Sequence, residues 1–137
     1  GLRRSELKSL TSEQLFFNQD SNTYYLRIVG KGGRVRNAPV LDEGAVDKIK
    51  SEKGLIWKKI PNGADIHFYR SVYCTRLYEM NARDRLSIPE EERYFCRKEL
   101  KGDRYDKPAM LIASKALGHN RIGDIAGHYL KTVGEDE

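Results

Sequence analysis

The pattern that most constrains the fold lies at residues 24–40, where two strand-like runs flank a glycine-rich turn. Residues 24–29, YYLRIV, are rich in the aromatic and β-branched side chains that strands favour. Three glycines within residues 30–33 supply a flexible turn, and residues 34–40 return as a second strand with Pro39 near its end. The sequence therefore predicts a small antiparallel β-sheet.

Helical signals cover most of the remaining chain. Asp42 and Asp65 stand where N-caps are expected, and Pro108 suits the first turn of a helix. Gly54 and Gly118 follow the last turns of two helical patterns, a position that glycine prefers. The predicted helices span residues 3–10, 43–52, 66–80, 108–117 and 121–133. The predicted fold class is α+β, mostly helical, with a small antiparallel β-sheet.

The helix expected at residues 66–80 carries two adjacent stripes. One repeats apolar side chains at helical spacing: Ile66, Tyr69, Tyr73, Leu77 and Met80. The other carries His67 and Arg70, three residues apart and therefore on one face, with Cys74 one turn further. We expect the apolar stripe to face the core, with the His67 and Arg70 side chains exposed beside it.

Composition limits the classes of protein that fit. The 137 residues suffice for one domain, and the net charge of +5 favours a polyanionic partner. Two distant cysteines, Cys74 and Cys96, are typical of a reduced, cytoplasmic protein. No apolar run reaches the roughly 20 residues of a membrane span, so we expect no membrane partner. The chain opens on GLRRSEL without an initiator methionine or a secretory core, and we expect it to be a piece of a longer protein.

Six polar residues carry the chemistry that the sequence offers, each within a short motif: GLRRSEL, VGKGGRVR, HFYR, LGH and GHYL. Two arginines can grip a phosphate through their planar donors. A lysine and two histidines can move protons, and a tyrosine can act as a nucleophile. Each residue alone also has an ordinary structural explanation, such as a solvated hairpin lysine or a core tyrosine. The six are Arg3, Lys31, His67, Arg70, His119 and Tyr129.

The order and rough spacing of these motifs resemble the catalytic domain of the tyrosine recombinases, the integrases of phages and mobile elements. The resemblance covers almost the whole chain. It implies that residues 1–137 form a C-terminal catalytic domain, truncated at its N-terminal side, with a charged insertion at residues 83–107. This charged insertion resembles that of the integrases of conjugative elements in Gram-positive bacteria.

The resemblance also implies a role for each residue. Tyr129 attacks the scissile phosphate, Arg3 and Arg70 stabilise its charge, and His119 adds a hydrogen bond. His67 takes the proton of the tyrosine and Lys31 protonates the leaving oxygen, while Glu6 holds Arg3 in place. The implied partner is double-stranded DNA at a specific recombination site. The implied assembly is a homotetramer on synapsed DNA and a monomer in isolation, in a bacterial cytoplasm, with no metal or other cofactor.

Three features depart from the family pattern. The interval from LGH to Tyr129 is one residue longer than usual, and position 128 is histidine. Tyr69 and Ser71 replace the leucine and histidine of the usual H-x-L-R-H motif. The segment from Arg70 to Leu117 is longer than usual because it contains the charged insertion.

Three other functions remain open on the sequence. A type IB topoisomerase uses similar residues to relax supercoils, although the short chain and the LGH motif favour a recombinase. A non-catalytic basic DNA-binding module would keep the positive charge but would lack the catalytic arrangement of the six residues. A ligand-binding or structural domain would match the motifs by chance.

Overall fold

The hairpin expected from residues 24–40 is present as strands β2 (Thr23–Val29) and β3 (Val35–Pro39). A further strand, β1 (Leu15–Asn18), pairs antiparallel with β2 and completes a three-stranded sheet in the order β1-β2-β3. The register places Leu26 opposite Leu15 on one side and opposite Ala38 on the other. These are the apolar, core-facing positions of the alternating strands.

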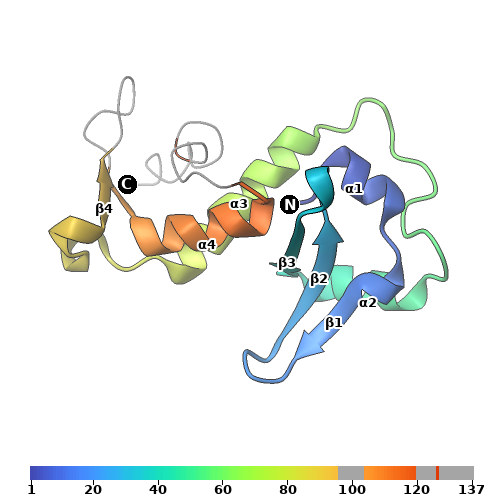
Figure 1. Ribbon diagram of the computed structural model, residues 1–137, viewed down its shortest axis with the longest axis horizontal. Coiled ribbons are helices and arrows are strands. Elements are labelled where there is room, and N and C mark those ends of the chain that lie inside the picture. Colours follow the sequence, from blue (N-terminus) through green and yellow to red (C-terminus); the bar gives the residue numbers. More distant parts are fainter. Residues whose placement is uncertain (96–103, 120–125, 127–137) are drawn as a thin grey trace.

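The computed structural model describes residues 1–95, 104–119 and 126, and this part of the chain is an α+β protein (Figure 1). The helices are α1 (Arg4–Ser9), α2 (Glu43–Ser51), α3 (Ile66–Asn81) and α4 (Lys107–Leu117). The predicted caps are confirmed: Asp42 accepts a hydrogen bond from the Gly44 amide, and Asp65 accepts one from the Phe68 amide. The helix expected at 121–133 lies outside the described residues, apart from the buried Ala126.

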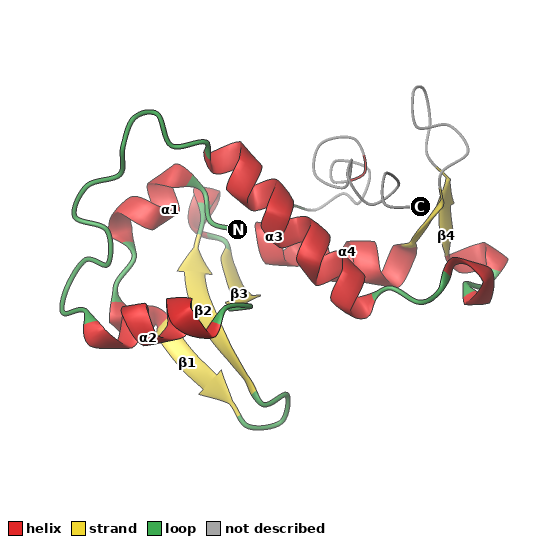
Figure 2. Ribbon diagram, turned by 180° about the vertical axis from the view of Figure 1, so that it is seen from behind, coloured by secondary structure: helices red, strands yellow, loops and turns green. Residues whose placement is uncertain are grey.

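The sheet and the two N-terminal helices share one apolar core. Leu2 and Leu10 flank α1, Leu26 and Ile28 come from β2, and Ile49 comes from α2. Figure 2 shows α1 and α2 beside the sheet and the pair α3–α4 on its other side. The β2–β3 hairpin is therefore anchored to α1 and α2 through this core.

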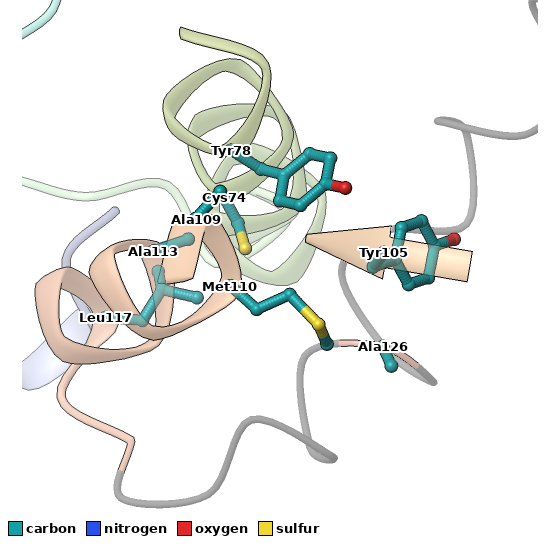
Figure 3. Close-up of a cluster of buried hydrophobic side chains, with 8 residues drawn as sticks. All are labelled: Cys74, Tyr78, Tyr105, Ala109, Met110, Ala113, Leu117 and Ala126. Carbon is teal, nitrogen blue, oxygen red and sulfur yellow. The ribbon is translucent and has the colours of Figure 1, made fainter. Parts of the chain in front are cut away.

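Helices α3 and α4 pack side by side around a second core, shown in Figure 3. Small side chains of α4, Ala109 and Ala113, lie against α3, and Met110 and Tyr105 belong to the same core. Tyr78 and Tyr105 meet edge to face with ring centroids 5.5 Å apart. The small side chains permit the close approach of the two helices.

The stripe of α3 expected to face the core is confirmed only in part: Leu77 is buried and Tyr73 packs against the second core, but other members of the stripe are exposed. Tyr69 and Met80 are 62% and 67% exposed, whereas the stripe of Arg70, Cys74 and Tyr78 is buried. The physical reason is the partner helix: α4 offers small side chains to Cys74, and the Leu117 carbonyl in its last turn accepts a hydrogen bond from Arg70. A charged residue whose donors are satisfied can be buried where an apolar one was expected.

The predicted insertion at residues 83–107 contains two short 3₁₀ turns and a second antiparallel pair, β4 (Arg93–Phe95) with β5 (Arg104–Asp106). Its Arg83 binds the Asp106 carboxylate through Nε at 2.9 Å and Nη2 at 2.8 Å. Asp106 is also the N-cap residue of α4. The buried carboxylate of Asp106 therefore joins the two ends of the predicted insertion, at the point where α4 begins.

Candidate functional site

A groove of about 730 Å³ opens where the β2–β3 turn, the start of α1 and the end of α4 meet. The basic side chains that line it are Arg3, Lys31, Arg34, Arg36, Lys115 and the imidazole of His119. Of the described residues that line the groove, none is acidic. Such a concentration of positive charge around a concave surface attracts an anion.

The glycine turn brings two of these cations to the mouth of the groove. The Gly30 amide donates to the Arg34 carbonyl at 2.7 Å, which closes the turn. Gly32 and Gly33 have φ values of 74° and 76°, a left-handed conformation that favours glycine. Lys31 and Arg34 are exposed on this turn and face the groove.

The C-terminal end of α4 collects arginines from three elements. The last carbonyls of a helix have no intrahelical partner, and they form the negative end of its dipole. Arginine side chains from the start of α1, from β3 and from α3 bind these carbonyls. The bonds are Arg36 Nε to Ala116 O at 2.9 Å, Arg70 Nη2 to Leu117 O at 3.1 Å and Arg3 Nη2 to Gly118 O at 3.5 Å.

Gly118 ends α4 in the left-handed conformation, with φ of 84°, as the LGH motif predicted. A Cβ atom at this position would lie 3.1 Å from Nη1 of both Arg3 and Arg36. The glycine therefore permits the left-handed conformation of the backbone and also leaves room for the two guanidinium groups. The turn places His119 beside Arg70, with 3.3 Å between His119 Nε2 and Arg70 Nη2.

Glu6 is the buried acid within this cluster. Both of its carboxylate oxygens accept hydrogen bonds of 2.7 Å from Arg36, and the Arg3 amide donates to it at 2.8 Å. Burial opposes ionisation of Glu6, but the bonds from Arg36 and Arg3 outweigh it and lower its pKa. The expected contact between Glu6 and the Arg3 guanidinium is present at 3.4 Å.

The structure brings part of the predicted set together. Arg3, Lys31 and His119 line the groove, and Arg70 lies buried behind His119. His67 is exposed on the first turn of α3, one turn from Arg70, and does not line the groove. Tyr129 lies outside the described residues.

Arg36 is the residue of the cluster that the sequence analysis missed. It is paired with Ile28 across the β2–β3 ladder and shares a strand face with the buried Ala38. The strand alternation contained the signal: an arginine at an inward-facing position needs buried partners, which here are Glu6 and a helix end. Lys115 and Arg34 were also not singled out, because solvated lysines and arginines are common on helices and turns.

The chain matches no family model, no curated protein and no solved structure. Within the described residues, no helix combines the length and apolar character that crossing a membrane requires. The same part of the chain contains no cluster of three or more His, Cys, Asp or Glu side chains suited to a metal ion.

Proposed function

We propose that this chain is the catalytic domain of a site-specific tyrosine recombinase, which cuts and rejoins DNA strands through a 3′-phosphotyrosine intermediate. The observation that carries the proposal is the convergence of Arg3, Arg70 and His119 at the end of α4, beside a cationic groove that also contains Lys31. The substrate is double-stranded DNA at a recombination site, bound by a homotetramer on synapsed DNA in the bacterial cytoplasm.

In the proposed reaction, the Tyr129 hydroxyl oxygen attacks the scissile phosphorus and the bond to the 5′-oxygen breaks. The proton of the tyrosine passes to His67, and Lys31 supplies a proton to the leaving 5′-oxygen. The products are a 3′-phosphotyrosine and a free 5′-hydroxyl. Because the phosphotyrosine keeps the bond energy, a 5′-hydroxyl of another strand can reverse the step without ATP.

The contacts of Arg3 suit it to receive a phosphate. Its side chain is 35% exposed, and its side-chain bonds to Glu6 and to the Gly118 carbonyl are long, at 3.4 and 3.5 Å. Phosphate oxygens offer an arginine shorter, charge-assisted bonds than these. Charge that develops on the phosphate during transfer is stabilised best by donors that are already in place.

Arg70 supports the same site from behind. Its guanidinium donates to the Gly1 and Leu117 carbonyls, at 2.9 and 3.1 Å, and contacts the His119 ring. An arginine has only donors, so His119 Nε2 accepts in this contact and the neutral ring carries its proton on Nδ1. Arg70 therefore holds the ring of His119, which lines the groove, and adds its own positive charge behind it.

The test of the proposal is formation of a covalent adduct between the protein and DNA. A pool of nicked duplexes with randomised sequence around the nick allows a productive site to be selected, because the short strand dissociates after cleavage and traps the adduct. We expect the parent protein to form adducts and Tyr129→Phe to form none while keeping most of its DNA affinity. Tyr105→Phe, which alters a buried core tyrosine, is the matched control and should form adducts. Adducts that persist in Tyr129→Phe would contradict the assignment.

A non-catalytic basic DNA-binding module is the second candidate. It is favoured by one observation: His67 and Arg70 do not line the groove. This function predicts salt-sensitive binding to duplexes and no adduct in the same assay. Relaxation of a supercoiled plasmid by the parent without exchange of strands would instead indicate an activity like that of a type IB topoisomerase.

A further inference from the structure

Arg36 is placed at the junction of three elements. Its side chain leaves β3, is 10% exposed and makes three short hydrogen bonds. Two of them bind both oxygens of Glu6 at the start of α1, and the third binds the Ala116 carbonyl in the last turn of α4. The two-oxygen contact fixes the plane of the guanidinium as well as its position.

Two glycines enclose this guanidinium. A Cβ atom at Gly30 would lie 3.3 Å from Arg36 Nη1, and one at Gly118 would lie 3.1 Å from the same atom. Both distances are shorter than ordinary van der Waals contact. The hairpin turn and the end of α4 therefore pack directly on Arg36, so a change in its side chain affects both walls of the groove.

Glu6 connects Arg36 to Arg3. The carboxylate accepts from the Arg36 guanidinium and also from the backbone amide and side chain of Arg3. A buried ion pair of this kind is weak evidence for stability, because desolvation of the charges offsets most of their attraction. The location of the pair behind a phosphate-binding arginine points to a role in orientation.

We propose that Arg36 is a positioning residue of the site: it orients Arg3 through Glu6, and it holds the end of α4 that carries His119. This inference rests on the proposed function, because it assigns Arg36 a task in the same strand cleavage. Arg36 itself does not act on the reacting atoms.

The role of Arg36 predicts a signature in the pH dependence of cleavage. The charged groups that face Glu6 are the guanidinium groups of Arg36 and Arg3 and the amino group of Gly1. Arg36 gives the largest of the contributions that lower the pKa of Glu6, so removing it leaves burial less opposed and raises this pKa relative to the parent. Glu6 would then become protonated as the pH falls, and Arg3 would lose its charged partner.

The experiment compares Arg36→Met and Arg36→Lys with the parent in single-turnover cleavage of the selected duplex at saturating protein. We expect Arg36→Met to be slower by about 10- to 100-fold, since small misplacements of catalytic groups have effects of this size. Its rate should also fall further as the pH is lowered, and adding Glu6→Gln to this variant should remove that extra fall. Arg36→Lys keeps the charge but cannot form the two-oxygen contact, so it should remain slow. Arg27→Met, an exposed arginine of β2 outside the groove, is the charge-matched control and should cleave at the parent rate.

The outcomes separate this inference from the proposed function. A parent that forms no adduct overturns the proposed function. A parent that forms adducts, with an Arg36→Lys variant that cleaves equally fast, overturns only the positioning role. A slow Arg36→Met variant whose pH profile parallels that of the parent also overturns it, because general destabilisation lowers the amount of active protein without a new titration. If Arg36→Met does not fold, Arg36→Lys alone decides the question.

Discussion

Both ends of α4 bind charged side chains, but within the described residues only the C-terminal end lies beside the cationic groove. At the N-terminal end, the 1% exposed Asp106 carboxylate is held by Arg83, and the Asp106 amide donates to the Tyr78 hydroxyl. At the C-terminal end, the last carbonyls accept bonds from Arg3, Arg36 and Arg70. Each end places the charge that the helix dipole favours.

The charge balance distinguishes the two ends. One arginine, Arg83, faces the carboxylates of Asp106 and Glu92, so these three described residues together have no excess of positive charge. At the C-terminal end, Glu6 faces both Arg3 and Arg36, and further cations line the adjacent groove. A buried arginine–carboxylate pair is thus not itself a sign of function. The excess of cations beside a groove is what favours an anionic substrate.

The largest expected effect is on catalysis at the C-terminal end. Arg3→Ala should slow strand cleavage by roughly 10²–10³, the usual loss when one preorganised donor is removed. Arg70→Ala should have an effect of similar size, because it releases His119 and removes a positive charge behind the site. DNA affinity should change less, because many phosphate contacts remain. The measurement is the single-turnover rate of adduct formation at saturating protein.

Arg83→Ala is the matched control for this prediction. It removes an arginine from the N-terminal cluster of the same helix, so the cleavage rate per folded molecule should stay close to that of the parent. Near-normal cleavage by Arg3→Ala, or a loss in Arg83→Ala as large as that in Arg70→Ala, would erase the distinction between the two ends.

The next effect is on stability at the N-terminal end. Asp106→Ala should lower the free energy of unfolding by about 3 kcal/mol, because it removes three hydrogen bonds from Arg83, two of them from its guanidinium, at a buried position. The measurement is urea unfolding followed by circular dichroism. Glu92→Gln alters a carboxylate that is 38% exposed and should change the free energy by about 0.5 kcal/mol or less. Equal losses in the two variants would show that the burial of Asp106 is not decisive.

Much of this architecture could be predicted from the sequence because its signals are local. The β2–β3 hairpin follows from side-chain type and glycine spacing, and the caps at Asp42 and Asp65 follow from the residues beside each helix. The end of α4 at Gly118 was predicted for the same reason. Arg3 and Glu6 were also correctly expected to be in contact, since they are three residues apart at the start of a helix.

The predictions that failed depend on contacts between residues that are far apart in the sequence. The buried face of α3 depends on the small side chains that α4 offers to Cys74 and on the carbonyls that satisfy Arg70, and no pattern within α3 contains this information. Arg36 was missed because its partners are 30 and 80 residues away along the chain. The position of Tyr129 relative to the groove stays a prediction.

A smaller effect should appear in the unfolding free energy at acidic pH, to which carboxylates at both ends of α4 should contribute in the same way. The pKa of Glu6 is lowered because bonds from Arg36 and Arg3 outweigh its burial, and bonds from Arg83 lower the pKa of Asp106. Carboxyls of the unfolded chain titrate near about 4, so the native state binds fewer protons than the unfolded state. Both groups therefore stabilise the protein above that pH, and this contribution is lost as the pH falls through their lowered values. Glu6→Gln and Asp106→Asn should each flatten the fall of the unfolding free energy between pH 5 and pH 2. An unchanged slope in either variant would mean that its carboxylate is not held as the contacts indicate.

The smallest effect should appear in the salt dependence of DNA binding, where two exposed lysines of α4 allow a direct comparison of its ends. Lys115 lines the groove at the C-terminal end, and Lys107 lies in the first turn at the N-terminal end. A lysine that contacts a DNA phosphate releases about one counterion, so Lys115→Met should weaken binding to duplexes of any sequence. It should also reduce the slope of log affinity against log salt by about one. Lys107→Met removes the same charge from the same helix and should leave that slope unchanged. A change in slope for Lys107→Met but not for Lys115→Met would place the DNA at the other end of the helix, beside the insertion.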